Sequence, residues 1–161
     1  MTDHDEIIEA KRRLRAAMRS MRRGLPDRQH RSAVIVELIT TLDAVQNARR
    51  VLAYDSIVGE VETAELVTWC RARDVDVAMP EDDVAADWPD VIIVPGTAFT
   101  ADGRRTGQGG GWYDRFLPGR RDDAVTIGIG FAEQLVDDVP TEPHDVVLDI
   151  VVTDAGIHAD L

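Results

Sequence analysis

The alternation of short strands with helices is the feature that most constrains the fold of this chain. Apolar runs rich in β-branched residues predict five strands, at residues 51–54, 75–79, 91–94, 125–129 and 148–152. Between the first two strands, residues 63–73 have the apolar periodicity of an amphipathic helix. Because parallel strands need helical crossovers, this order predicts a three-layer α/β fold, a mostly parallel, Rossmann-like sheet with helices on both faces.

Two more helices are expected before the first strand. Residues 5–23 carry apolar side chains at helical spacing, and Gly24 ends that segment. Pro26 and Asp27 then begin a second helix that continues to about Leu42, with Asp27 as its N-cap. Because we find no linker and no internal repeat, we expect one domain over residues 1–161.

Composition excludes several classes of function. The chain has a net charge of −12, with 44% hydrophobic and 30% charged residues, which is typical of a globular protein. Such an acidic chain would repel nucleic acid, so we expect no nucleic-acid partner. The apolar runs are too short to cross a bilayer, and a lone cysteine, Cys70, fits a reducing compartment. We therefore expect a cytoplasmic monomer with no membrane contact.

Lys11 is the only lysine of the chain and lies on the apolar side of the first predicted helix. The apolar residues that share its stripe are Ile7, Leu14, Met18 and Met21. An unpaired charge is costly to bury, so one interpretation is that Lys11 contacts an anion. The other is that its aliphatic stem lies along the stripe with the head group in water.

The densest group of functional residues is a glycine-rich loop. Its residues are Gly107, Gln108, Gly109, Gly110 and Gly111, followed by Trp112, Tyr113 and Asp114 at the start of a helix that reaches Leu117. Glycines let successive N–H groups turn toward one point, which suits a polyphosphate. The loop lacks the Gly-Lys-Ser/Thr of a Walker A motif, and the alternative is a flexible loop without a ligand.

Two carboxylates are candidates for holding Mg²⁺ beside such phosphates. Asp114 follows the glycines, and Asp145 precedes the last predicted strand. Mg²⁺ commonly takes one or two carboxylates together with phosphate oxygens. Alternatively, Asp114 only interacts with the dipole of the following helix.

Residues 91–117 resemble the most specific signature of the 5-formyltetrahydrofolate cyclo-ligase family, also called methenyltetrahydrofolate synthetases. Shorter stretches resemble the same family in the same order along the chain, at residues 10–15, 59–63, 127–134 and 140–145. The resemblance implies a ligase that uses ATP and Mg²⁺ to convert 5-formyltetrahydrofolate to 5,10-methenyltetrahydrofolate, releasing ADP and phosphate. The implied ligands are therefore ATP and a reduced folate.

The resemblance also implies roles for individual residues. Catalytic roles fall on Lys11, Arg105 and Tyr113. The ATP site would comprise Lys11, Arg15, Arg105, the loop Gly107, Gln108, Gly109, Gly110 and Gly111, and Trp112, Tyr113 and Asp114. Asp114 and Asp145 would hold Mg²⁺. Tyr54 would stack on the pterin and Glu60 would accept from its N–H groups; alternatively, Tyr54 is a core residue and Glu60 a surface acid.

The chain departs from the family pattern in two places. Residues 81–90 stand where the family usually has more strands and a loop, and Thr106 and Gln108 replace residues common in the glycine signature. The chain is thus predicted to be a shortened member. Two other functions therefore stay open: a diverged ATP-dependent enzyme acting on a smaller substrate, and a non-catalytic nucleotide- or folate-binding protein.

Overall fold

A six-stranded sheet forms the centre of the protein in the computed structural model, which describes residues 2–159. Five neighbouring strands are parallel, and the sixth pairs antiparallel with the fifth. In spatial order they are β2 (Asp76–Ala78), β1 (Arg50–Leu52), β3 (Val91–Val94), β6 (Val125–Ile129), β7 (Ile150–Thr153) and β8 (Gly156–Ala159). The five parallel strands are the five that the sequence predicts.

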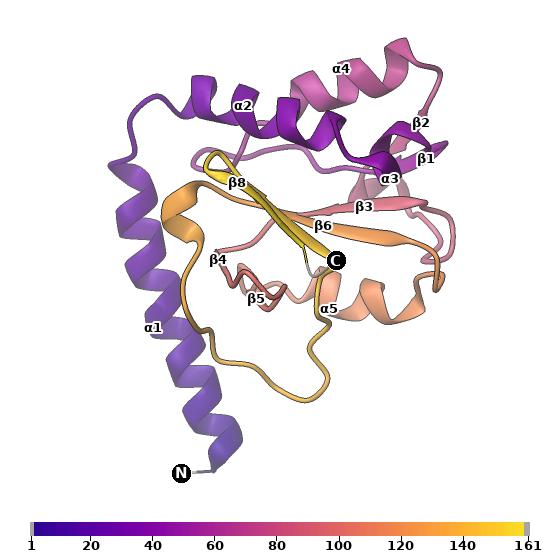
Figure 1. Ribbon diagram of the computed structural model, residues 1–161. Helices are drawn as coiled ribbons and strands as arrows, with labels where there is room; N and C mark the ends of the chain where they lie inside the picture. Colours follow the sequence, from indigo (N-terminus) through magenta and orange to yellow (C-terminus); the bar gives the residue numbers. More distant parts are fainter. Residues whose placement is uncertain (1, 160–161) are drawn as a thin grey trace.

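Helices cover both faces of this sheet, which confirms the predicted three-layer α/β fold (Figure 1). One face carries α2 (Arg28–Thr40), α3 (Asp43–Gln46) and α4 (Ala64–Ala72). The other carries α5 (Trp112–Phe116) and a ribbon of β4 (Ala98–Phe99) and β5 (Arg105–Thr106). Three 3-10 turns complete the elements, η1 (Pro80–Asp82), η2 (Leu117–Gly119) and η3 (Ala132–Gln134).

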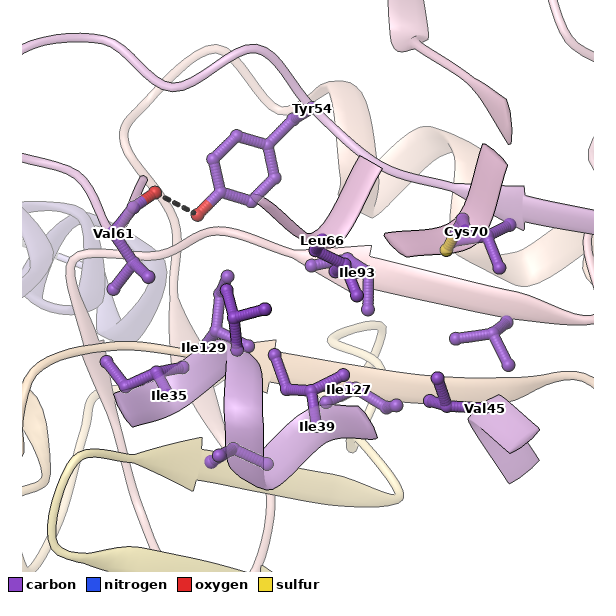
Figure 2. Packing of buried hydrophobic residues seen from close by; sticks show 14 of the residues in the cluster. Ile35, Ile39, Val45, Tyr54, Val61, Leu66, Cys70, Ile93, Ile127 and Ile129 are labelled. Atoms are coloured by element: carbon purple, nitrogen blue, oxygen red, sulfur yellow. Dashed lines mark hydrogen bonds between the residues drawn. The ribbon is translucent and has the colours of Figure 1, made fainter. Parts of the chain in front are cut away.

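The residues of β3 form an unbroken apolar run because both faces of this strand are buried. Val91 and Ile93 belong to the hydrophobic cluster under α2 and α4, whereas Ile92 and Val94 belong to the cluster under α5. Figure 2 shows the first cluster, where side chains from two helices meet those of the sheet. All four β3 side chains are buried, and each contributes about 1.5–3 kcal/mol by leaving water.

The helix α1 (Asp3–Arg23) stands apart from the other helices and lies across the ends of the central strands (Figure 1). Its predicted inner stripe is confirmed, since Ile7, Lys11, Leu14, Met18 and Met21 are all partly buried. The opposite side of α1 is exposed and highly charged. In residues 2–159, no helix combines the length and apolarity needed to cross a membrane.

Asp27 takes the predicted N-cap position of α2, but its side chain does not cap the helix. Asp27 takes a left-handed conformation, with φ of 56°, and its side chain makes no capping hydrogen bond. An N-cap residue usually has an extended backbone, which lets its side chain accept from the N–H groups of the first turn. The left-handed backbone of Asp27 does not have this geometry. Only the Asp27 backbone carbonyl joins the helix, accepting from Arg31 N at 2.9 Å.

The sequence analysis missed the edge strand β8. It forms a hairpin with β7, in which Val152 lies opposite Ile157. The segment is short and partly exposed, and Ile157 is 39% exposed. Because an edge strand buries little of its surface, its residues carry only a weak hydrophobic pattern.

Candidate functional site

The strand order of the sheet reverses at β1, and this position is a candidate site for a ligand. β2 lies on one side of β1 and β3 on the other, so the chain segments that follow β1 and β3 diverge at the carboxyl ends of these strands. In open α/β sheets, such a crevice is where ligands bind. The loop after β1 contains Tyr54 and Glu60, and the segment after β3 leads through β4 and β5 into the glycine loop.

The glycine loop has the backbone geometry that its sequence predicts. Gly109 has φ of 108° and Gly111 has φ of 72°, both in the left-handed region that favours glycine. A Cβ atom on Gly110, by contrast, would meet nothing within 4 Å. The loop thus needs glycine for its backbone at two positions, and its predicted phosphate contacts stay a prediction.

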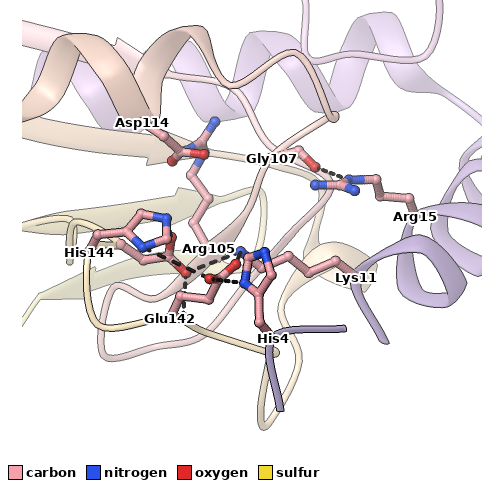
Figure 3. Close-up of polar contacts among 9 residues, drawn as sticks. His4, Lys11, Arg15, Arg105, Gly107, Asp114, Glu142 and His144 are labelled. Carbon is pink, nitrogen blue, oxygen red and sulfur yellow. Dashed lines mark hydrogen bonds and ion pairs between the residues drawn. The ribbon is translucent and has the colours of Figure 1, made fainter. Parts of the chain in front are cut away.

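The helix α1 reaches this loop through Arg15. Its Nε donates to the Gly107 carbonyl oxygen at 2.8 Å, across 92 residues of sequence (Figure 3). The same two residues were predicted to contact the ATP phosphates, so the fold brings together two parts of the predicted cradle. The Arg15 guanidinium adds positive charge beside the loop, which would attract an anion.

Lys11 lies one turn before Arg15 and contacts two carboxylates. Its Nζ is 3.3 Å from Asp145 Oδ2 and 3.6 Å from Glu142 Oε1, and its side chain is only 13% exposed (Figure 3). The interpretation with the head group in water is therefore wrong. Asp145 also accepts from the backbone N–H of Glu142 at 2.8 Å. Lys11 thus holds the loop before β7 against α1.

Arg105 is the most buried of the predicted phosphate-binding cations. Its Nε donates to the Pro95 carbonyl at 2.9 Å, its Nη1 lies 3.4 Å from Asp114 Oδ1, and its guanidinium sits 5.4 Å from the centre of the Tyr113 ring. Burial lowers the pKa of Arg105, and Asp114 opposes that shift. These contacts fix the position of the guanidinium, and its predicted phosphate contact stays a prediction.

Tyr113 has a buried hydroxyl group with no hydrogen-bond partner in residues 2–159. Burial raises the pKa of this phenol, and the nearby Arg105 opposes the rise. An unpaired buried hydroxyl is costly, so such a group points to an acceptor supplied by a ligand. The predicted catalytic residues Arg105 and Tyr113 are thus in contact with each other.

The two predicted Mg²⁺ ligands are both engaged by cations. Asp114 contacts Arg105, and Asp145 contacts Lys11. Within the described part of the chain, no three His, Cys, Asp or Glu side chains cluster as a metal site would require. Carboxylates are suitable donors for Mg²⁺, and the Asp114 side chain is 40% exposed, so it fits a metal that is bound mainly through phosphates.

Of the two residues predicted to bind folate, Glu60 contacts the glycine loop and Tyr54 lies in the hydrophobic core. Glu60 Oε2 accepts from Gln108 Nε2 at 2.7 Å, so this acid meets the glycine loop. Tyr54 is 5% exposed, packs in the cluster of Figure 2, and donates its hydroxyl to the Val61 carbonyl at 3.2 Å. The structure therefore places Tyr54 as a core residue, and its stacking on a pterin stays a prediction.

Comparison with known proteins identifies the relatives of this chain. Residues 81–154 match the model of the 5-formyltetrahydrofolate cyclo-ligase family. A mitochondrial 5-formyltetrahydrofolate cyclo-ligase of Arabidopsis thaliana is 39% identical over 48% of this chain and 32% of its own length. A mouse 5-formyltetrahydrofolate cyclo-ligase is 23% identical over 91% of this chain and 94% of its own length. The chain is related to the 5-formyltetrahydrofolate cyclo-ligases.

Solved structures show the same fold. A 5,10-methenyltetrahydrofolate synthetase of Aquifex aeolicus has a TM-score of 0.78 at 21% identity, with 92% of each chain covered. A second synthetase, from Mycoplasma pneumoniae, has a TM-score of 0.75 at 22% identity and is covered over 98% of its length. The predicted resemblance is confirmed. The first curated relatives, however, are matched over only about a third of their length.

The mouse relative has residues that this chain lacks within the matched region. The alignment with the mouse protein runs over 191 positions, more than the 161 residues of this chain, so that relative has residues with no counterpart here. The segment predicted to be shortened forms η1 and a turn before β3. It borders a 590 Å³ cavity beside α4, lined in part by Met79, Glu81 and Asp82.

Two residues of this region were missed from the sequence. Glu142 pairs with Lys11 and also contacts His4 Nδ1 at 2.8 Å. It therefore connects the loop before β7 to two positions on α1. Arg22, at the end of α1, is buried near Glu60. The signal for Glu142 was its place in the 140–145 stretch, whereas Arg22 stood among many arginines that nothing distinguished.

Proposed function

We propose that this protein is an ATP-dependent 5-formyltetrahydrofolate cyclo-ligase that forms 5,10-methenyltetrahydrofolate with release of ADP and phosphate. One observation carries the proposal: the cation Arg15 on α1 meets the glycine loop at Gly107, at the carboxyl end of the sheet. The family relationship supplies the substrate class. The contact supports the proposal, because it brings Arg15 to the loop with which it is predicted to bind phosphate.

The chemistry asks the protein to stabilise negative charge while a phosphoryl group moves. The formyl oxygen of the substrate attacks the γ-phosphorus of ATP, and ADP leaves. N10 then attacks the activated carbon, and phosphate departs. Lys11, Arg15 and Arg105 would bind the phosphates and offset the charge that develops in the first step. Tyr113, whose hydroxyl has no partner among the described residues, would donate to a phosphoryl oxygen.

Three finer points belong to this proposal. Mg²⁺ would be held by Asp114 and Asp145 and would neutralise charge on the nucleotide when bound. Binding of anionic phosphates would compete with the carboxylates for Arg105 and Lys11, and so release Asp114 and Asp145 toward the metal. We also propose that the protein works as a monomer in the cytoplasm, where its buried Cys70 would stay reduced.

The test is the ATP-dependent appearance of methenyltetrahydrofolate absorbance from 5-formyltetrahydrofolate. We expect turnover that requires ATP and Mg²⁺ and that falls strongly in Arg15→Ala, whose partner is the loop. The matched control is Arg12→Ala, because Arg12 lies on the exposed side of the same helix and its ion pair within residues 2–159 is with Glu9. Folded protein that binds ATP but never forms this product would refute the proposal.

A second function is favoured by one observation, the contact between Gln108 and Glu60. This contact occupies the predicted pterin acceptor, Tyr54 lies in the core, and the space that Tyr54 and Glu60 line together leaves no room for a pterin. An ATP-dependent enzyme of the same fold acting on a smaller acceptor would fit this site. That enzyme would hydrolyse or use ATP with a non-folate compound, whereas a purely binding protein would retain folate or nucleotide without forming any product.

A further inference from the structure

Gln134 ends the stretch of residues 127–134 and is a buried polar residue, only 2% exposed. Both ends of its amide group are hydrogen-bonded. Oε1 accepts from the Phe131 backbone N–H at 2.8 Å, and Nε2 donates to the carbonyls of Gly96 and Thr97, both at 3.1 Å. Because a buried amide is costly unless it is bonded in this way, these contacts account for its place in the interior.

The two carbonyls belong to residues 95–97, which connect β3 to β4 and which we call the β3–β4 loop. This loop contacts the predicted phosphate cradle at two points. The Pro95 carbonyl accepts from Arg105 Nε at 2.9 Å, and Thr97 Oγ1 donates to the Gly107 carbonyl at 3.2 Å. The same Gly107 oxygen accepts from α1. The position of the β3–β4 loop therefore sets the positions of a predicted catalytic cation and of the first glycine of the glycine loop.

The β3–β4 loop is held on several sides. Gly96 lies so close to the Phe99 ring that an added Cβ atom would be 2.7 Å from a ring carbon. The Thr97 backbone N–H donates to the Thr106 carbonyl at 2.8 Å, which joins the loop to β5. Gln134 supplies donors for the two loop carbonyls that point the other way. Without its amide, these carbonyls would be buried beside an apolar group.

The turn η3, which carries Gln134, is itself anchored at both ends. At its start, the Ala132 backbone N–H donates to Asp154 Oδ1 at 2.8 Å, and Arg31 Nε donates to Asp154 Oδ2 at 2.8 Å. Just after its end, the Val136 backbone N–H donates to the Phe99 carbonyl at 2.8 Å. A residue can position a site only when its own location is fixed, and η3 meets that condition.

We propose that Gln134 is a positioning residue for phosphoryl transfer, which holds Arg105 and Gly107 in place through the β3–β4 loop. The inference rests on the proposed function, because that function supplies the phosphates. Two of its three hydrogen bonds go to this loop, and the third closes its own turn at Phe131. A misplacement of about 1 Å can cost about a hundredfold in rate, so such a residue affects the reaction without touching a ligand.

The test compares two variants that each remove buried hydrogen bonds. Gln134→Met keeps a similar side-chain volume and removes every hydrogen bond of the amide. Thr126→Val is the matched control, because Thr126 is also fully buried and lies on β6, the strand that leads to η3. Among the described residues its hydroxyl bonds only to Asp149, at 3.0 Å and 2.9 Å. Denaturant titration first confirms that each variant is folded, and steady-state kinetics then gives kcat and the KM for 5-formyltetrahydrofolate.

We expect kcat to fall at least about tenfold in Gln134→Met, with the KM for 5-formyltetrahydrofolate within about twofold of the wild type. The control should keep the kcat of the wild type even where its stability is lower. Equal losses of kcat in the two variants would assign the effect to stability and overturn the inference. An unchanged kcat in Gln134→Met, or an effect confined to the folate KM, would also overturn it while leaving the proposed function intact.

A second variant separates the loop contacts from the rest of the side chain. Gln134→Glu keeps an acceptor for the Phe131 N–H and removes the amide donors to the β3–β4 loop. It should lose kcat as Gln134→Met does, and full activity in this variant would contradict the role of the loop contacts. If neither variant folds, Gln134 serves folding instead of positioning, and the inference is overturned.

Backbone amide exchange reports on the β3–β4 loop without any activity. The Thr97 N–H is bonded to the Thr106 carbonyl, so its exchange should be faster in Gln134→Met than in the wild type or in Thr126→Val. Equal exchange in all three proteins would show that Gln134 does not hold this loop, and would overturn the inference.

Failure of the proposed function can be told apart from failure of this inference. If the folded wild type shows no turnover, the proposed function fails, and tripolyphosphate then serves as the probe in a calorimetric titration. Binding to the wild type and to Thr126→Val that is at least about tenfold weaker in Gln134→Met would support a positioned phosphate site. Equal binding by all three proteins, or no binding by the wild type, would overturn the inference as well.

Discussion

Gln108 in the glycine loop donates to Glu60 in the loop after β1, with 2.7 Å between Nε2 and Oε2. The contact joins the predicted nucleotide side of the site to the predicted folate side. Glu60 Oε1 in turn accepts from the Ile57 backbone N–H at 2.9 Å, so both carboxylate oxygens are occupied. A substrate bound by Glu60 would share these oxygens with Gln108 or displace it, and either event would couple the two sides.

The first prediction concerns Glu60 itself. Glu60→Gln removes the negative acceptor that the pterin N–H groups would use, so the KM for 5-formyltetrahydrofolate should rise about tenfold. Steady-state kinetics with saturating ATP measures this KM. Glu62→Gln is the control, because Glu62 is an exposed acid two residues away. Equal effects of the two variants would remove Glu60 from the site.

The second prediction concerns the ion pair that joins α1 to the loop before β7. Lys11→Ala leaves Glu142 and Asp145, each with a side chain about one-eighth exposed, facing one another without their cation. We expect a loss of unfolding free energy of about 1–3 kcal/mol and an ATP affinity at least about tenfold weaker. Denaturant titration and nucleotide binding measure the two effects. Unchanged nucleotide affinity would contradict the phosphate role of Lys11.

The third prediction separates function from stability at Tyr113. Because its hydroxyl has no partner in the described structure, Tyr113→Phe should leave the free energy of unfolding unchanged or slightly higher. Its kcat should nonetheless fall, since the hydroxyl would donate to a phosphoryl oxygen. Tyr54→Phe is the comparison, because that hydroxyl donates to the Val61 carbonyl and its loss should cost about 1 kcal/mol. Full activity in Tyr113→Phe would contradict the assigned role.

The fourth prediction concerns acid stability. Arg31 bonds to Glu133 and Asp154 and so ties α2 to the turns after β6 and β7. The Arg31 hydrogen bond lowers the pKa of Glu133 below its usual 4.5. A pKa lowered by folding adds stability that is present above pH 4.5 and lost as the pH falls through the folded-state pKa.

The stability difference between the wild type and Glu133→Gln should therefore be present at pH 7 and disappear in acid. Denaturant titrations at a series of pH values measure this difference. Glu37→Gln is the control, because Glu37 is an exposed acid on α2 that forms no ion pair in residues 2–159. A difference that stays constant from pH 7 to pH 3 would show that the ion pair is not its origin.

The fifth prediction tests the backbone of the glycine loop. Gly109→Ala forces a side chain into φ of 108°, although no neighbour lies closer than 3.9 Å to the added Cβ. We expect a destabilisation of about 1 kcal/mol or a local rearrangement that weakens ATP binding. Gly110→Ala, which adds a Cβ in open space, should leave stability unchanged. Equal unfolding free energies for the two variants would show that the loop does not need this conformation.

Much of the fold could be predicted because it depends on burial. The β3 strand is covered on both faces, so all four of its residues must be apolar, and this run is visible in the sequence. The same holds for the inner stripe of α1. Strand β8 and the conformation of Asp27 could not be predicted, since neither depends on a hydrophobic pattern.

The site could be predicted residue by residue but not as a set of contacts. Glycines and cations predict a phosphate cradle by residue type, and the fold does bring Arg15 to Gly107. Which acid faces which cation depends on loops, so the pairing of Lys11 with Glu142 had no signal in the sequence. Tyr54 shows the converse, because an aromatic residue after a strand suits both a pocket and a core.

We propose that the α1 cations and the glycine loop drive ATP-dependent cyclisation of a reduced folate. The most direct measurement follows ADP and 5,10-methenyltetrahydrofolate together in one reaction with 5-formyltetrahydrofolate. We predict one ADP for each methenyltetrahydrofolate formed, and a loss of both products in Arg15→Ala. ADP released without methenyltetrahydrofolate, or neither product from folded protein, would contradict the account.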